Sequence, residues 1–216
     1  TTIVAFGDSM TEGKVSPPVA FGFGWTLPPD AGISQSYPFK LKALLEARYT
    51  TQKITVINAG WSGRQAREDE SRFRSVLSTV KPDLVLLMEG ANDLIAARQP
   101  GEGDNARVRS TVDALEEMVR EAVERRGIPL MIATLPPQRP GTEKALPVHM
   151  VPLFNDALPP MASRRGGHLV DIGSLPLSFI GQDGLHPSEA GYQRIAELWM
   201  TAIRSRHEKA SASAVQ

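Results

Sequence analysis

The chain has 216 residues, of which 41% are hydrophobic and 22% charged, so it is long enough to bury one substantial core and fits a single globular domain. Its 24 basic and 24 acidic residues cancel, and no long basic stripe favours nucleic acid, so we expect a small neutral or apolar partner. The lack of cysteine in the sequence excludes disulfides, thiolate catalysis and metal sites with cysteine ligands.

The two ends of the chain differ from the central part. The first residues, from Thr1, lead directly into an apolar run without the features of a signal peptide. We expect a soluble protein that has lost an upstream segment: an export signal, a lipid-anchored linker or the rest of a cloned chain. No apolar run approaches the roughly 20 residues that span a bilayer. We place the domain at residues 1–207 and a disordered tail at residues 208–216, which are small, polar and aperiodic.

Strand-like apolar runs alternate with helical patterns along the chain. The strands are predicted at Ile3 to Phe6, Ile54 to Ile57, Leu84 to Met88, Leu130 to Ala133 and His168 to Asp171. The helices are predicted at about Tyr37 to Tyr49, Glu68 to Val80, Asn105 to Arg126, Val151 to Arg165 and after Pro187. This alternation predicts an α/β fold: a flavodoxin-like, three-layer α/β/α sandwich with a five-stranded parallel sheet.

Ligands of such sheets bind outside the carboxyl ends of the strands, so the residues that follow each strand are the candidates for function. These are Gly7-Asp8-Ser9, Asn58-Ala59-Gly60-Trp61-Ser62-Gly63, Glu89-Gly90-Ala91-Asn92-Asp93, Leu135-Pro136-Pro137 and, through a longer loop, Asp183-Gly184-Leu185-His186-Pro187.

An acyl-transfer site can be assembled from these segments. A serine becomes a good nucleophile when an imidazole accepts its proton and a carboxylate orients that imidazole. Asp183 can fold back to Nδ1 of His186, which leaves Nε2 to face Ser9, and Pro187 suits the first position of the last helix. The N–H groups of Ser9 and Gly63 and the side-chain amide of Asn92 could stabilise an oxyanion.

Four motifs stand in order along the chain: Gly7-Asp8-Ser9, Gly63, Gly90-x-Asn92-Asp93 and Asp183-x-x-His186. Together they resemble the SGNH subgroup of the GDSL esterases and lipases. The resemblance implies the SGNH hydrolase fold and three catalytic residues, with Ser9 as nucleophile, His186 as base and Asp183 as its partner. It also implies an oxyanion hole formed by Ser9, Gly63 and Asn92.

Some residues depart from the family's pattern or fall outside it. Met10 stands where the family's name has leucine, a swap that conserves volume. A glycine five residues after an asparagine favours Gly63 over Gly60, which we expect to ease the turn. Asp8 and Asp93 are interpreted as structural. The acidic run Glu68-Asp69-Glu70 is interpreted as a solvated helix start.

None of the remaining histidines, at positions 149, 168 and 207, has an acid at a comparable spacing in a comparable loop, and they lack the spacing of zinc ligands. We therefore expect no metal and no cofactor. The loops from Lys14 to Ser36 and from Leu135 to Pro152 should overhang the site and select the substrate. Candidate substrate contacts are Phe23, Trp25, Trp61 and Leu135. Whether the aromatic side chains line an acyl cleft or plug the loop onto the domain stays open.

The sequence therefore predicts a serine ester hydrolase, an esterase or lipase that cleaves small-molecule carboxylic esters of short to medium acyl chain. A carbohydrate O-acetylesterase or an acyl thioesterase would use the same mechanism. A ligand-binding module without turnover and a flavodoxin-like nucleotide or receiver domain are alternatives of other classes, and the latter leaves Asn92 and the Asp183–His186 pair unexplained. The sequence does not specify an oligomeric state.

Overall fold

A computed structural model of the chain describes residues 1–15, 35–142, 144 and 148–208. Five parallel strands form one sheet in the order β2-β1-β3-β4-β5. They are β1 (Thr2–Gly7), β2 (Thr55–Gly60), β3 (Leu84–Met88), β4 (Leu130–Ala133) and β5 (His168–Val170). All five predicted strands are present, and β2 continues past its predicted end at Ile57.

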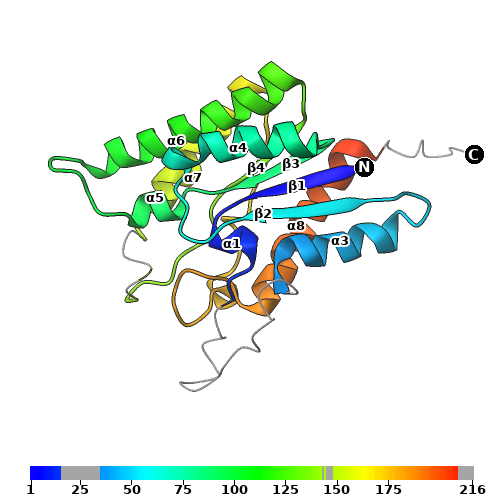
Figure 1. Cartoon of the computed structure of the whole chain (residues 1–216). Helices are drawn as coiled ribbons and strands as arrows, with labels where there is room; N and C mark the ends of the chain where they lie inside the picture. Colours follow the sequence, from blue (N-terminus) through cyan, green and yellow to red (C-terminus); the bar gives the residue numbers. More distant parts are fainter. Residues whose placement is uncertain (16–34, 143, 145–147, 209–216) are drawn as a thin grey trace, which may run out of the picture.

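Helices cover both faces of the sheet (Figure 1). Helices α3 (Tyr37–Arg48) and α8 (Glu189–His207) pack together on one face. Helices α4 (Ala66–Val80), α6 (Asp104–Arg120) and α7 (Met150–Arg165) cover the other. The three-layer α/β/α sandwich is therefore confirmed. Strands β1 and β3 lie at its centre, and their apolar side chains are almost fully buried, as expected for strands covered on both faces.

Several short elements were missed by the sequence analysis. Helices α1 (Ser9–Glu12) and α5 (Ala91–Ile95) and the 3-10 turn at Leu177–Phe179 are too short to show a helical period. The long helix predicted to reach Arg126 instead changes at its end into a π-helical turn, Glu121–Arg125. The positions of such short elements are determined by the strand ends that precede them and by their capping residues.

The start of the last helix also differs from the prediction. Ser188 is its N-cap, and its Oγ accepts a hydrogen bond from the N–H of Gly191, so the helix begins at Glu189. Pro187 therefore lies before the cap rather than at the first helical position, and it pairs with Ile180 in a short antiparallel bridge. The serine hydroxyl accepts a hydrogen bond from an N–H group of the first helical turn, which a proline side chain at the cap could not do.

The C-terminal end is ordered further than predicted. Glu208, assigned above to a disordered tail, accepts hydrogen bonds from Arg48 Nε at 3.0 Å and from the Tyr49 hydroxyl at 2.8 Å. Residues 209–216 lie outside the described part of the chain. Among the helices that the structure describes, none is long and apolar enough to cross a membrane.

Gly60 lets the end of β2 approach α1 closely, rather than easing a turn as expected above. A Cβ at this position would lie 2.0 Å from the backbone nitrogen of Glu12. The side chain of Asn58 reinforces the contact, because its Nδ2 donates to the carbonyl of Glu12 at 3.1 Å. The helix that begins with Ser9 is thus held against β2.

Replacement of Gly60 by alanine should force this helix away from β2. We expect Gly60→Ala to lower the free energy of unfolding by about 2 kcal/mol or more, because the new methyl group would clash with the backbone of Glu12, which cannot move aside as a flexible side chain could. Urea unfolding measures the loss. Gly103→Ala is the matched control, since a Cβ at Gly103 meets nothing within 4 Å. Equal stability of the two variants would contradict the close approach.

Candidate active site

Ser9 stands where the central strand β1 ends and helix α1 begins. Asp8 caps this helix: its Oδ1 accepts a hydrogen bond from the N–H of Met10 at 2.9 Å. The hydroxyl of Ser9 lies 2.9 Å from Nε2 of His186, although the two residues are 177 positions apart in sequence. Both residues are almost fully buried, at 6% and 3% exposure. A buried serine is thus paired with an imidazole at hydrogen-bond distance.

Asp183 orients the imidazole from the other side. Its Oδ2 lies 2.6 Å from Nδ1 of His186, and its Oδ1 accepts the N–H groups of Leu185 and His186 at 3.0 and 2.9 Å. Burial alone would raise the pKa of this carboxyl, but the hydrogen bonds and the charge of His186 hold it well below its usual range. An ionised carboxylate only accepts, so Nδ1 donates to Asp183 and Nε2 is left to accept from Ser9.

A cavity of about 260 Å³ opens beside the serine. Its walls come from the ends of β1, β2 and β3, from the loop before α8 and from the segment between β4 and α7: Ser9, Lys14, Ser62, Gly63, Asn92, Ile95, Lys144, Leu185 and His186. The strand order places β2 and β3 on either side of β1, so their carboxyl ends meet at this cavity. The structure therefore brings all five residues predicted for the catalytic and oxyanion roles to one place, except that Asp183 stands behind His186 rather than in the wall.

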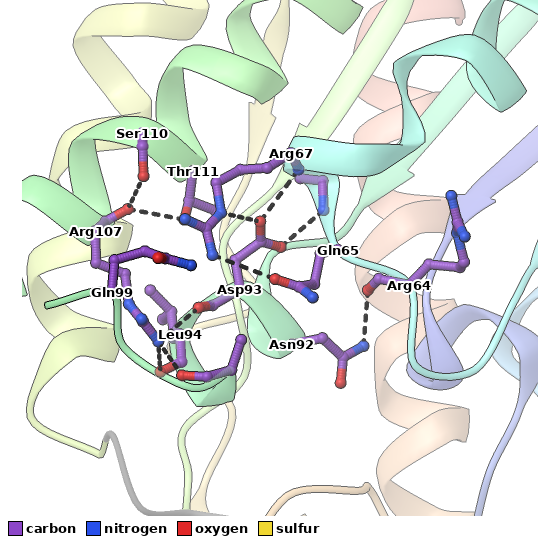
Figure 2. A network of polar contacts seen from close by, with 12 residues as sticks. Arg64, Gln65, Arg67, Asn92, Asp93, Leu94, Gln99, Arg107, Ser110 and Thr111 are labelled. Carbon is purple, nitrogen blue, oxygen red and sulfur yellow. Dashed lines mark hydrogen bonds and ion pairs between the residues drawn. The ribbon is translucent and has the colours of Figure 1, made fainter. Parts of the chain in front are cut away.

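The amide of Asn92 is held in a fixed orientation (Figure 2). Its Nδ2 donates one hydrogen to the carbonyl oxygen of Arg64 at 2.9 Å. An amide nitrogen carries two hydrogens, so the second remains for the cavity that Asn92 lines. The next residue, Asp93, accepts the N–H groups of Ala66 at 2.7 Å and Arg67 at 3.1 Å, which fixes the end of β3 against the start of α4.

Gly63 lies in a tight turn after β2. The N–H of Arg64 donates back to the carbonyl of Trp61, and Gly63 has a φ of +81°, a backbone conformation that favours glycine. The carboxylate of Glu12 holds the turn through hydrogen bonds from both the N–H and the hydroxyl of Ser62. The turn therefore has a fixed position beside the serine.

Of the four candidate substrate contacts, the two that the structure describes, Trp61 and Leu135, do not line the cavity beside Ser9. Phe23 and Trp25 lie outside the described residues. Trp61 is 58% exposed, with the guanidinium of Arg64 5.7 Å from its ring centre, and it is not in the cavity wall. Leu135 is 1% exposed in the core, where Asn155 binds its backbone on both sides, so it is a packing residue.

The apolar part of the cavity wall comes instead from Ile95 and Leu185, which the sequence analysis did not single out. Lys144 was also missed, and its Nζ lies 3.6 Å from Oδ2 of Asp183. Leu185 could have been found from its place between the two motif residues Asp183 and His186. Ile95 and Lys144 carry no such signal, since loops and a five-residue helix bring them to the site.

Buried charges lie beneath the site. Asp69, interpreted above as solvated, is fully buried and pairs with Arg64 and Arg72, so that interpretation was wrong. Asp8 and Glu89 follow paired residues of neighbouring strands, Gly7 and Met88, and are also buried. Oδ2 of Asp8 and both carboxyl oxygens of Glu89 have no hydrogen-bond partner among the described residues. Two such carboxyls side by side favour protonation.

No metal site emerges from the described residues, because they hold no group of three or more histidine, aspartate or glutamate side chains suited to a metal ion.

Comparisons with known proteins identify a family and solved structures of the same fold. The sequence matches the GDSL-like lipase/acylhydrolase family over residues 5–194. A lipase/acylhydrolase from Enterococcus faecalis is similar in structure, with a TM-score of 0.72, 24% identity and 95% of this chain and 96% of that chain covered. An acetylxylan esterase from Geobacillus stearothermophilus gives a TM-score of 0.69 at 22% identity, covering 94% and 93% of the two chains.

A sequence relative, an acetylxylan esterase from Geobacillus stearothermophilus, is 31% identical over 93 residues. The matched segment makes up 43% of this chain and 39% of that relative. The chain therefore spans well under half the length of this curated relative, while the structural neighbours are matched over almost their whole length and establish the fold.

The buried carboxyls predict that stability falls as pH rises. Burial, opposed by the hydrogen bond from Met10, raises the pKa of Asp8 to about 7, and burial with the charges of Asp69 and Asp8 raises the pKa of Glu89. The folded protein therefore binds more protons than the unfolded chain above about pH 4. We expect the free energy of unfolding to decrease by about 2–4 kcal/mol between about pH 5 and 8.

Urea unfolding across this pH range measures the decrease. Glu89→Gln removes one of the two ionisable groups and should leave a shallower slope, while the control Glu68→Gln, at an exposed position of α4, should keep the wild-type slope. A slope that Glu89→Gln does not change would mean that this carboxyl is ionised to the same extent in the folded protein and in the unfolded chain, which would contradict its raised pKa.

Proposed function

The chain belongs to the GDSL-like lipase/acylhydrolase family, and we propose that it is a serine ester hydrolase that cleaves carboxylic esters of short to medium acyl chain. The observation that carries the proposal is the continuous hydrogen-bonded series from Ser9 through His186 to Asp183. A serine, an imidazole and a carboxylate in this order and at hydrogen-bond distance are the arrangement with which serine hydrolases transfer acyl groups. The substrate is a small-molecule ester, and Ser9 would carry its acyl group as a covalent intermediate.

In the first half-reaction, Oγ of Ser9 attacks the ester carbonyl carbon. Nε2 of His186, 2.9 Å away, accepts the hydroxyl proton as the new C–O bond forms. The imidazolium is stabilised by Asp183, which stays ionised. When the tetrahedral intermediate collapses, Nε2 returns this proton to the departing alcohol, and the acyl group remains on Ser9.

The oxyanion of that intermediate would be stabilised by three donors: the N–H groups of Ser9 and Gly63 and the second hydrogen of the Asn92 amide. These groups line the same cavity. The turn around Gly63 and the bond from Asn92 to the carbonyl of Arg64 hold them before substrate arrives. Donors that need no reorganisation stabilise the transition state more than the ground state.

In the second half-reaction, a water takes the place of the alcohol. Nε2 of His186 accepts its proton, hydroxide adds to the acyl carbon, and collapse of the second tetrahedral intermediate releases the carboxylic acid and restores Ser9. The same residues serve both halves, so no cofactor is needed.

The cavity favours a small acyl group. Its volume is about 260 Å³, and Ile95 and Leu185 give it two apolar walls. A carbohydrate O-acetylesterase is a second candidate, favoured by the sequence relative of that class, an acetylxylan esterase. An acyl thioesterase would use the same residues and differ in its leaving group.

Hydrolysis of 4-nitrophenyl esters from acetyl to dodecanoyl tests the proposal. We expect turnover with an optimum at short chains and a loss of kcat of at least about 10⁴-fold in Ser9→Ala, because the nucleophile is removed. Circular dichroism of the variant checks that it is folded. Turnover that survives in Ser9→Ala would remove Ser9 from its role, and a folded wild type without turnover on any ester would favour the ligand-binding alternative.

Asn92→Ala should lower kcat by about 10²–10³-fold with little change in KM, since its amide would act on the transition state. Asn92→Asp, which keeps the shape but brings an acceptor, should lose at least as much. Asn105→Ala, on helix α6, is the control and should keep wild-type kcat. An unchanged kcat in Asn92→Ala would assign the oxyanion to other donors.

A further inference from the structure

A second cavity, of about 400 Å³, opens at the carboxyl ends of β4 and β5. We call it the β4–β5 cavity. Its walls are the loop after β4, the first turns of α7 and the loop after β5, and it shares no wall residue with the cavity beside Ser9. Its size is that of a small-molecule site.

Gln138 is the unusual residue of this cavity. It lies in the wall, is only 5% exposed, and its Oε1 has no hydrogen-bond partner among the described residues. A buried amide oxygen that stays unpaired destabilises a fold by roughly 1–3 kcal/mol. An apolar side chain of similar size would avoid this loss, so the amide is best explained by a ligand that pairs with it.

The other wall residues define the class of that ligand. Among the wall residues that the structure describes, the charged ones are the acids Asp156 and Asp171, and none is a lysine, arginine or histidine, which disfavours an anion. The neighbouring Arg139 is engaged elsewhere, because its guanidinium donates to the backbone carbonyls of Leu177 and Ile180. Prolines and valines supply the apolar part of the wall.

A neutral, hydroxyl-rich molecule matches these groups. Hydroxyls donate to carboxylates and both donate to and accept from an amide, and the C–H groups of a sugar ring pack against proline and valine. Asn155, also in the wall, uses one hydrogen and its oxygen on the backbone of Leu135, which fixes the orientation of its amide. Sugar is therefore the ligand class that these residues fit.

The cavity is linked to the catalytic loop. The residue after Gln138, Arg139, donates its N–H to the carbonyl of Gly184 at 2.8 Å, next to Asp183. Both cavities open at the carboxyl edge of the sheet, and β1 and β4 are two strand spacings apart, about 10 Å. Neighbouring sugar units of one chain can span such a separation.

We propose that the β4–β5 cavity binds a neutral sugar unit of the substrate while an ester on a neighbouring unit of the same chain lies at Ser9. The inference rests on the proposed function, and it narrows the alcohol part of the ester to an oligosaccharide. Gln138 would be a specificity-determining residue that does not touch the reacting atoms.

Binding is tested in the Ser9→Ala protein, so that no turnover interferes. Xylotriose, cellotriose and mannotriose are titrated separately, and the backbone amide signals of Gly173 and Ser174, in the cavity wall, are followed by NMR. We expect saturable shifts with at least one of the three sugars and a Kd about tenfold higher when Gln138→Leu is added. Gln99→Leu, at an exposed site outside the cavity wall, is the matched control.

Two readouts separate this proposal from the proposed function. In the otherwise wild-type protein, Gln138→Leu should keep kcat/KM for 4-nitrophenyl acetate within about twofold, lower kcat/KM for the acetylated form of the bound sugar about tenfold, and leave Tm equal or higher. No saturable shift with any of the sugars, an unchanged Kd in Gln138→Leu, or the same shifts produced by calcium chloride alone would overturn it. Loss of ester turnover in the wild type would overturn the proposed function instead.

Discussion

The guanidinium of Arg72 holds together the two strand ends from which the site is built. Nη1 donates to the carbonyl of Ala59 at 2.6 Å, near the end of β2, and Nη2 donates to the carbonyl of Gly7 at 3.1 Å, at the end of β1. Carbonyls at strand ends need such partners when they are buried. The guanidinium lies 3.9 Å from the ring centre of Phe6, and Asp69 balances its charge. Ser9 and the turn of Gly63 therefore start from strand ends with a fixed separation.

The third strand end is tied in by two consecutive residues. Asp93 binds the first N–H groups of α4, while Asn92 binds the carbonyl of Arg64 in the turn that precedes this helix (Figure 2). The ends of β2 and β3 thus share one polar network. Each N–H donor near Ser9 is positioned by partners outside the cavity, so the donors do not depend on substrate for their arrangement.

The sequence was a good guide wherever the signal is local. Continuous apolar runs identified the five buried strands, and the motifs around Ser9, Gly63, Asn92 and His186 identified the residues that meet at the cavity. Its failures have a common physical cause. Asp69, near the start of α4, resembles a solvated acid, but the packing of α4 on the strand ends buries it beside Arg72 of the same helix. Leu135 resembles a cleft residue, but Asn155 binds its backbone in the core. Pairings between distant segments decide burial, and no local pattern contains them.

The carboxyl edge of the sheet carries two separate cavities, one at the ends of β1, β2 and β3 and one at the ends of β4 and β5. On the proposed function, the groups at the ends of β1, β2 and β3 would act on any ester, whereas the loops after β4 and β5 border a separate space that can differ between proteins of the same fold. The two regions still share a support, because the backbone of Arg139 binds Gly184 and its side chain binds Leu177 and Ile180 in the loop that leads to His186. On the proposed function, a ligand that orders the loop of Gln138 would also order the loop of His186 through the bond from Arg139 to Gly184, and this would couple recognition of the alcohol to the geometry of proton transfer.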